Sequence, residues 1–217
     1  MIKISKKPLK SCIVLCGGMS TRMGRDKGSM ILNDEPIIYT VLKNLDSHVD
    51  EVFLVLRDQN QVNYYKKLLN SYLSDDYLDF RFAFNFNLKF LIDDIMGQGP
   101  LAGIMIGLSV IMGEYALVLP CDSPYVSSDF IDNMFNEMEA FSECDALIPQ
   151  WENGDLEPLH AIYHINSRNI INQMFLTEKR DVKSLINKIN SHFIKVSKLD
   201  SSLKSYKNIN CPDDILK

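Results

Sequence analysis

The chain has 217 residues, of which 46% are hydrophobic, and a formal net charge of −5 at pH 7. A chain of this length and apolar content can bury one sizeable core, and its acidic balance argues against a nucleic-acid partner. The five cysteines are scattered and lack the spacing of a zinc site, so we expect reduced thiols in a cytoplasmic protein.

We expect neither a secretory leader nor a membrane span. The first residues, MIKISKKPLKS, are charged but lack the apolar core and cleavage site of a signal peptide. The apolar run Cys12–Cys16 is only as long as a strand, whereas a membrane span needs roughly 20 residues. These features predict a cytoplasmic protein without membrane contact.

Strand-like and helix-like segments alternate along the chain. Short apolar, β-branched runs predict buried strands, and apolar residues at helical spacing predict helices. In chain order, the pattern predicts a strand at 11–16, a helix at 36–45 with Pro36 in its first position, a strand at 51–56, a helix at 61–73, strands at 80–84 and 89–92, a helix at 99–111, a strand at 115–120, a helix at 127–141 capped by a serine, and a strand at 145–149.

The pattern after about residue 150 is less regular. It predicts strands at 159–165 and 192–196 and helices at 169–175 and 182–189. The alternation implies right-handed crossovers, and therefore an α/β fold with a mostly parallel sheet. Without a repeat or a linker, we expect one domain over residues 1–217. Ligands of such sheets bind at the carboxyl ends of the strands.

An unusual stretch follows the first predicted strand. Residues 15–27 read LCGGMSTRMGRDK, in which two adjacent glycines are followed by Arg22, Arg25 and Lys27. Glycine lets the backbone approach an anion, successive amides can form an anion-binding nest, and arginine and lysine can bind phosphate oxygens. The stretch lacks the closing G-K-[ST] of a Walker loop. We interpret it as phosphate-binding; the alternative is an ordinary turn with solvated cations.

A second unusual stretch, LVLPCDSPY, follows the strand predicted at 115–120. Asp122 lies just beyond this strand, between Pro120 and Pro124, which limit the freedom of the backbone. A carboxylate at this place can hold a hard cation such as Mg²⁺ against a substrate phosphate. The alternative is a cap for the next helix, a role that Ser127 or Ser128 also suits.

An acidic pair, Asp93 and Asp94, precedes the glycine-rich GQGPLAG at 97–103. This stretch misses the dinucleotide fingerprint G-x-G-x-x-G by one residue and is weak evidence by itself. The pair could bind a ribose hydroxyl, a base edge or a metal, or it could be a solvated turn.

These motifs, in this order, resemble the molybdenum cofactor guanylyltransferase family. The stretches LCGGMSTRMGRDK, GPLAGI and PCDSP carry the resemblance, which continues to EPLHAIY at 157–163 and NINCPDDI at 208–215 and so spans nearly the whole chain. Cys16 stands where the family usually has alanine; because both are small, we expect little change.

The resemblance implies a Rossmann-like nucleotidyltransferase fold with a three-layer architecture. It implies a GTP-binding part at about 11–150 and a pterin-facing part at about 151–217. The implied reaction transfers GMP from GTP to the terminal phosphate of molybdenum-bound molybdopterin, with Mg²⁺ as cofactor and pyrophosphate as second product. It also implies transient contact with a cofactor carrier or an acceptor molybdoenzyme.

The family's functional residues match positions of this sequence. Leu15, Cys16 and Gly17 match the start of the GTP-binding loop, and Gly18, Arg22 and Lys27 match its phosphate-contacting part. Asp93 matches a nucleotide-contacting aspartate, with Asp94 as the alternative alignment. Asp122 matches the aspartate that binds Mg²⁺ and GTP, and Asn208 and Asn210 match asparagines on the pterin side. The implied catalytic residues are Arg22, Lys27 and Asp122.

Two alternatives remain. The cytidylyl branch of these enzymes uses CTP, but its loop more often reads L-A-A-G without an aspartate before the lysine, so Gly17 and Asp26 favour guanine. A catalytically idle nucleotide-binding protein could share the fold, although the presence of Lys27 and Asp122 argues against it.

Overall fold

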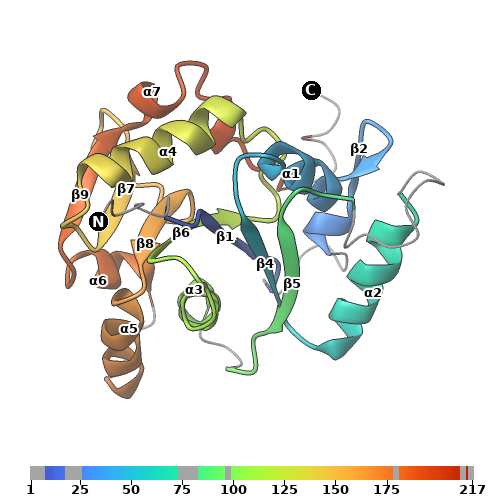
Figure 1. Cartoon of the computed structure of the whole chain (residues 1–217), viewed down its shortest axis with the longest axis horizontal. Coiled ribbons are helices and arrows are strands. Elements are labelled where there is room, and N and C mark those ends of the chain that lie inside the picture. Colours follow the sequence, from blue (N-terminus) through green and yellow to red (C-terminus); the bar gives the residue numbers. More distant parts are fainter. Residues whose placement is uncertain are drawn as a thin grey trace, which may run out of the picture.

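The structure is a computed structural model, which describes residues 8–17, 26–72, 83–95, 99–177, 181–210 and 214. A central sheet lies between two layers of helices (Figure 1). This arrangement confirms the predicted α/β fold with a mostly parallel sheet. Within the described ranges, no helix has the length and apolar character needed to cross a membrane.

The central sheet has seven strands in the order β5-β4-β1-β6-β8-β7-β9. Strand β8 runs antiparallel to both of its neighbours, and every other neighbouring pair is parallel. The strands are β1 (Ser11–Leu15), β4 (Glu51–Leu56), β5 (Asn87–Ile92), β6 (Tyr115–Pro120), β7 (Ala146–Gln150), β8 (Ala161–His164) and β9 (Ser191–Lys195).

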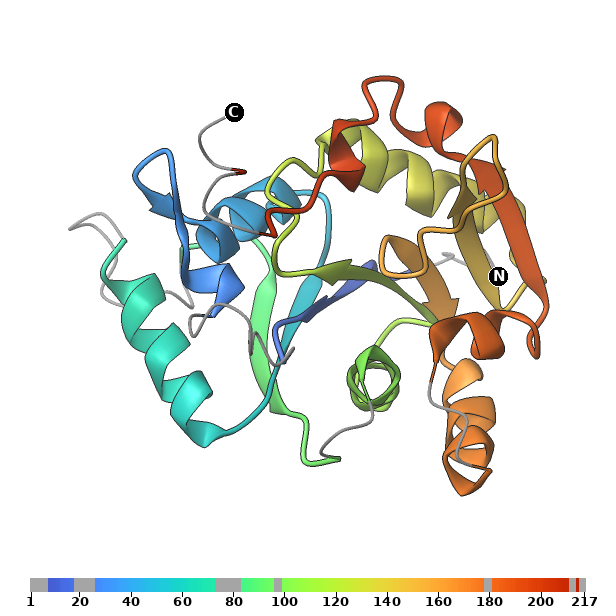
Figure 2. The ribbon, with the colours of Figure 1, turned by 180° about the vertical axis from the view of Figure 1, so that it is seen from behind.

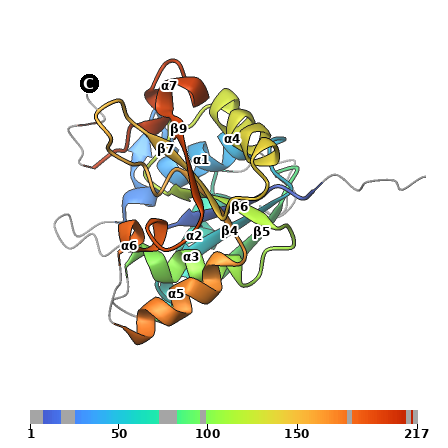
Figure 3. The same ribbon diagram turned by 90° about the vertical axis from the view of Figure 1, so that its left-hand side faces the viewer.

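Helices cover both faces of the sheet because its strands carry apolar side chains on both faces. In β1, Cys12 and Val14 point to one side, whereas Ile13 points to the other. The first side is covered by α1 (Ile37–Leu45), α2 (Gln59–Asn70), α4 (Ser128–Ala140) and α7 (Val196–Leu199). The second is covered by α3 (Pro100–Leu108), α5 (Ser167–Leu176) and α6 (Val182–Ile186), and α5 lies along α3 (Figure 3).

Two predicted elements differ in the structure. The strand predicted at 80–84 is absent where it can be checked: residues 80–82 lie outside the described ranges, and Phe84 instead stacks on Phe86 with ring centroids 5.0 Å apart. Pro36 precedes α1 instead of starting it, because it pairs with Ile31 in a small hairpin of β2 (Ile31–Leu32) and β3 (Glu35–Pro36).

The strand order places a topological switch next to β1. From β1 the chain continues to β4 and β5 on one side, and it then returns to β6 on the other side. Open α/β sheets bind ligands at such a point, outside the carboxyl ends of the strands. The C-terminal segment also reaches this end of β6 (Figure 2). The fold therefore predicts a ligand site formed by the residues that follow β1 and β6.

Helix α3 packs closely on the sheet because glycines face it. A Cβ atom added to Gly107 would lie 2.5 Å from Ile13 Cδ1 and 2.6 Å from its Cγ1. A Cβ atom added to Gly103 would lie 2.7 Å from Leu15 Cδ2, which belongs to the last residue of β1. The close approach of α3 to β1 thus depends on having glycine at positions 103 and 107.

We predict that Gly107→Ala lowers the free energy of unfolding by about 1–3 kcal/mol, because overpacking against Ile13 outweighs the roughly 1 kcal/mol gained in helix propensity. Ile13→Val removes the nearest atom, so adding it to Gly107→Ala should restore part of the loss. Urea unfolding of the two single variants and the double variant measures this coupling. A stabilising Gly107→Ala would contradict the packing described above.

Candidate nucleotide and metal site

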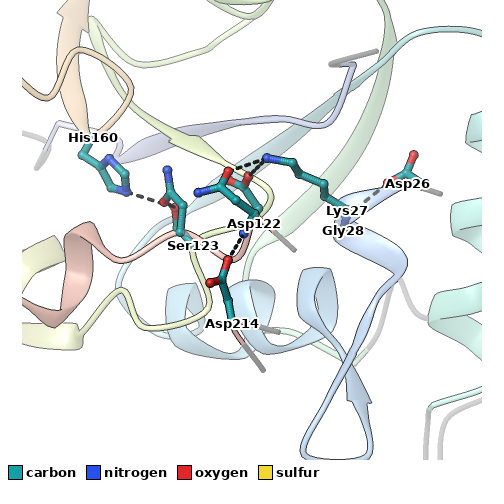
Figure 4. A network of polar contacts seen from close by, with 9 residues as sticks. Asp26, Lys27, Gly28, Asp122, Ser123, His160 and Asp214 are labelled. Atoms are coloured by element: carbon teal, nitrogen blue, oxygen red, sulfur yellow. Dashed lines mark hydrogen bonds and ion pairs between the residues drawn. The ribbon is translucent and has the colours of Figure 1, made fainter. Parts of the chain in front are cut away.

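Three polar side chains from distant parts of the chain meet where β1 and β6 end (Figure 4). Lys27 begins the short 3-10 helix η1 (Lys27–Ser29), Asp122 follows β6, and Asn210 belongs to the C-terminal segment. The Lys27 Nζ atom lies 2.7 Å from Asp122 Oδ2 and 2.7 Å from Asn210 Oδ1. The structure thus brings together three of the residues predicted from the sequence.

Main-chain hydrogen bonds fix the position of Asp122. Cys121 N donates to Leu15 O at 3.1 Å, which extends the pairing of β1 with β6, and Ile209 N donates to Asp122 O at 2.8 Å. The helix-cap alternative is wrong, because Ser127 caps α4 by accepting a hydrogen bond from Phe130 N at 3.1 Å. Asp122 is therefore available for another role.

The Asp122 carboxylate has the features of a cation ligand. The residue is only 7% exposed, and its Oδ1 atom has no hydrogen-bond partner among the described residues. A buried acceptor without a partner is costly, so this oxygen suits a ligand that arrives later. Mg²⁺ is commonly held by one or two carboxylates together with substrate phosphates. Among the described residues, no group of three acidic, histidine or cysteine side chains could hold a metal by itself. A single carboxylate that shares its metal with substrate phosphates is consistent with this finding.

The start of the predicted phosphate-binding stretch continues β1. Leu15 is the last residue of that strand, and Cys16 N donates to Val55 O at 2.8 Å. Burial raises the pKa of the Cys16 thiol well above its ordinary value, so this cysteine stays protonated. A Cβ atom on Gly17 would lie 3.7 Å from Arg57 N, an ordinary contact, so the described residues leave room beside this glycine.

Two residues predicted for the phosphate-binding stretch, Gly18 and Arg22, lie outside the described residues. Arg25 lies outside them as well. The next described residue is Asp26, whose side chain accepts hydrogen bonds from Gly28 N and from the side chains of Gln61 and Tyr65. Both carboxylate oxygens of Asp26 are thus bound within the protein, which gives this aspartate a structural place beside Lys27.

The acidic pair after β5 lies at the same edge of the sheet, two strands from β1. Asp93 N donates to Leu56 O at 2.7 Å, and the Asp93 side chain accepts a hydrogen bond from Ile95 N at 3.1 Å. Burial raises the pKa of Asp93, and the charge of Asp94 raises it further. Asp93 is partly buried and Asp94 is exposed, so Asp93 is the more firmly placed of the two.

The C-terminal segment is attached to the site through residues that sequence reasoning did not assign. Asn208 Oδ1 accepts a hydrogen bond from Ser123 Oγ at 2.6 Å, and the Nε2 atom of His160 lies 3.0 Å from the same hydroxyl. Ser123 and His160 are both buried. Their bonds, together with that of Ile209 N to Asp122 O, place Asn210 beside Lys27.

Comparisons with known proteins show which family this chain is similar to. A family model described as "MobA-like NTP transferase domain" matches residues 12–193. The chain is 38% identical to a "Probable molybdenum cofactor guanylyltransferase" of Methanothermobacter thermautotrophicus over 95% of this chain and 98% of that one. It is 31% identical to a protein of the same name from Methanosarcina mazei, over 98% and 91%. The resemblance predicted from the motifs is thereby confirmed.

A solved structure is also similar. It is molybdopterin-guanine dinucleotide biosynthesis protein A from Archaeoglobus fulgidus, which matches with a TM-score of 0.74 and 26% identity. The match covers 96% of this chain and 95% of that one. The predicted Rossmann-like nucleotidyltransferase fold is therefore confirmed.

We predict that Asp93→Asn raises the unfolding temperature of the unliganded protein at pH 7. The raised pKa of Asp93 means that its charged form disfavours the folded state. Asparagine removes the charge and can still accept the bond from Ile95 N. The gain in unfolding temperature should shrink as the pH falls from the pKa of Asp93 in the folded protein towards about 3.9, the pKa of an aspartate in the unfolded chain. It shrinks because the wild-type carboxyl then also becomes neutral.

Thermal unfolding at a series of pH values tests this prediction. Asp94→Asn is the matched control, because the neighbouring carboxylate is exposed and should give a smaller gain. An Asp93→Asn protein that is less stable than the wild type at pH 7 would show that the Asp93 carboxylate stabilises the fold.

Proposed function

Because this chain belongs to the family of MobA-like NTP transferases, we propose that it transfers GMP from GTP to the terminal phosphate of molybdenum-bound molybdopterin. The products are the molybdopterin guanine dinucleotide cofactor and pyrophosphate. The observation that carries this proposal is the contact of Lys27 with Asp122 at the switch point of the sheet. The second carboxylate oxygen of Asp122 has no hydrogen-bond partner among the described residues. The names of the relatives support GTP and molybdopterin as substrates.

The proposed reaction is an in-line displacement at phosphorus. An oxygen of the molybdopterin phosphate forms a bond to the α-phosphorus of GTP while the bond from that phosphorus to the leaving pyrophosphate oxygen breaks. Negative charge grows on the leaving and equatorial oxygens, so positioning and electrostatic stabilisation provide most of the catalysis. The attacking phosphate is already ionised at neutral pH, and no general base is needed.

The roles of the residues follow from this chemistry. Lys27 keeps its contact with Asp122 and exchanges its contact with Asn210 for the triphosphate, and Arg22 binds the same group. The Gly17 and Gly18 backbone allows the close approach of phosphate, and Leu15 and Cys16 carry this backbone at the end of β1. Lysine and arginine suit phosphate oxygens because they keep their charge at neutral pH.

Asp122 would hold Mg²⁺ through its Oδ1 atom, which has no hydrogen-bond partner among the described residues. When bound, Mg²⁺ neutralises charge on the phosphates and orients them. Asp93 contacts the nucleotide at the same edge of the sheet, and Asn208 and Asn210 face the pterin side. A carrier that delivers molybdopterin or an acceptor molybdoenzyme is the corresponding transient partner.

We predict that GTP raises the unfolding temperature more than CTP, ATP or UTP does, and that Mg²⁺ changes the effect. At 100 times its dissociation constant a ligand stabilises by about 2.7 kcal/mol, which is roughly 5 to 11 °C for a chain of this size. Lys27→Ala should lose most of the shift, whereas Lys43→Ala, which removes an exposed lysine paired with Glu35, should keep it. A thermal-shift panel measures these effects.

The outcomes of this panel separate the alternatives. A larger shift with CTP would assign the chain to the cytidylyl branch. The absence of a shift with every nucleotide at millimolar concentration would contradict the proposed activity. A shift with GTP but no turnover in a pyrophosphate-release assay would favour the catalytically idle nucleotide-binding protein.

We predict that Asp122→Ala abolishes Mg²⁺-dependent release of pyrophosphate, because the variant loses both the metal ligand and the partner of Lys27. Asp129→Ala is the matched control, since Asp129 lies exposed in the first turn of α4, close to the site in sequence but outside it. A pyrophosphate-release assay with molybdopterin as acceptor gives the rates. Near-normal turnover by a folded Asp122→Ala protein would remove this residue from its metal role.

A further inference from the structure

One side chain of α2 bonds to both chain segments that flank residues 17–25. The Nε2 atom of Gln61 donates to Cys16 O at 3.0 Å and also to the Asp26 carboxylate. Its Oε1 atom accepts a hydrogen bond from Arg57 N at 2.7 Å. Gln61 is only 5% exposed, so all the hydrogen-bonding groups of its amide are used inside the protein.

A second side chain of the same helix holds the other oxygen of Asp26. The Tyr65 hydroxyl donates to Asp26 Oδ1, which also accepts from Gly28 N at 3.1 Å. Tyr65 is fully buried; burial raises the pKa of its hydroxyl, and the negative charge of Asp26 raises it further, so it remains a donor.

Gly28 makes room for this arrangement. A Cβ atom on Gly28 would collide with the Tyr65 hydroxyl and would lie 3.4 Å from the Cβ atom of Cys121. The absence of a side chain at position 28 therefore lets Tyr65 reach the residue before Lys27. This also offers a structural reason for the glycine that follows Lys27.

Helix α2 is itself firmly placed. Its first turn is capped by Asp58, which accepts a hydrogen bond from Gln61 N at 2.8 Å, and its apolar side packs into the core through Val62 and Leu69. The two bonds to Asp26 therefore connect Lys27 to the rigid part of the fold. Without them, the 2.7 Å contact from Lys27 Nζ to Asp122 would depend on the local bonds of η1, on its packing against α1 and on Asn210.

We propose that Gln61 and Tyr65 are positioning residues for nucleotide binding: they fix Asp26, and thereby direct the Lys27 ammonium group to Asp122 and to the triphosphate. This inference rests on the proposed function, because the ligand that Lys27 would bind is the triphosphate of GTP. Neither side chain touches the nucleotide in this proposal; each acts through Asp26.

Exchange of the two hydrogen-bonding partners tests this role. Gln61→Glu places a carboxylate against Asp26, and Asp26→Asn places an amide against Gln61, so each single change should weaken Mg·GTP binding by about tenfold. In the double variant the amide introduced at position 26 can donate to the carboxylate introduced at position 61, which restores the bond with its direction reversed. We expect the double variant to recover to within roughly threefold of the wild type, the remainder reflecting the lost bond to Cys16 O.

The measurements are the dissociation constant of Mg·GTP, by isothermal titration calorimetry, and the unfolding temperature of each unliganded protein. Gln59→Glu is the matched control: it makes the same change on the exposed face of α2 and should leave the affinity for GTP unchanged. Tyr65→Phe keeps the aromatic packing, loses the bond to Asp26, and should weaken binding severalfold.

The results distinguish this inference from the proposed function. A lower unfolding temperature in the single variants, with wild-type affinity for GTP, would mean a merely structural role and overturn the inference while the proposed function stands. Failure of the double variant to bind more tightly than Gln61→Glu would overturn it as well. A wild-type protein that binds no nucleotide would overturn both.

Discussion

The contact between Lys27 and Asp122 is the interaction on which the site depends. A carboxylate on a residue that is only 7% exposed is costly to ionise without a partner, and Lys27 supplies the opposite charge 2.7 Å away. Both groups can still bind a ligand. Among the described residues, Lys27 has two acceptors for its three donor hydrogens, and one oxygen of Asp122 has no hydrogen-bond partner. The pair can therefore accept an anion and a cation together, as a metal-bound triphosphate requires.

The sheet sets where the two segments that carry these residues begin. Parallel pairing aligns Leu15 with Pro120, so the segments that leave β1 and β6 begin side by side. The strand order reverses at β1, and open α/β sheets bind ligands at such a point. Close packing of α3, which needs Gly103 and Gly107, holds the end of β1 in place. The position of the site is thus a consequence of topology, and its chemistry comes from two short loops.

Much of this arrangement could be predicted from the sequence. Buried parallel strands appear in the sequence as apolar runs. Glycines beside cations indicate phosphate binding, and an aspartate directly after a strand indicates metal binding. The strand predicted at 80–84 was wrong where it can be checked, because Phe84 packs against another ring instead of pairing in the sheet. Gln61, Tyr65 and Ser123 could not be found, because the partners of their side chains are distant in sequence. His160 lies within EPLHAIY, but the sequence does not show that it contacts Ser123.

The C-terminal segment connects the two parts that the sequence distinguishes. Ile209 N donates to Asp122 O, so the residue that would hold the metal also anchors the segment carrying Asn208 and Asn210. His160, beside β8, contacts Ser123 next to that aspartate, and β8 pairs with β6. Displacement of Asn210 from Lys27 by a triphosphate would therefore act on a segment that is bonded to Ser123, which also contacts His160. Under the proposed function, nucleotide binding would in this way be coupled to the C-terminal segment through Asp122 and Ser123.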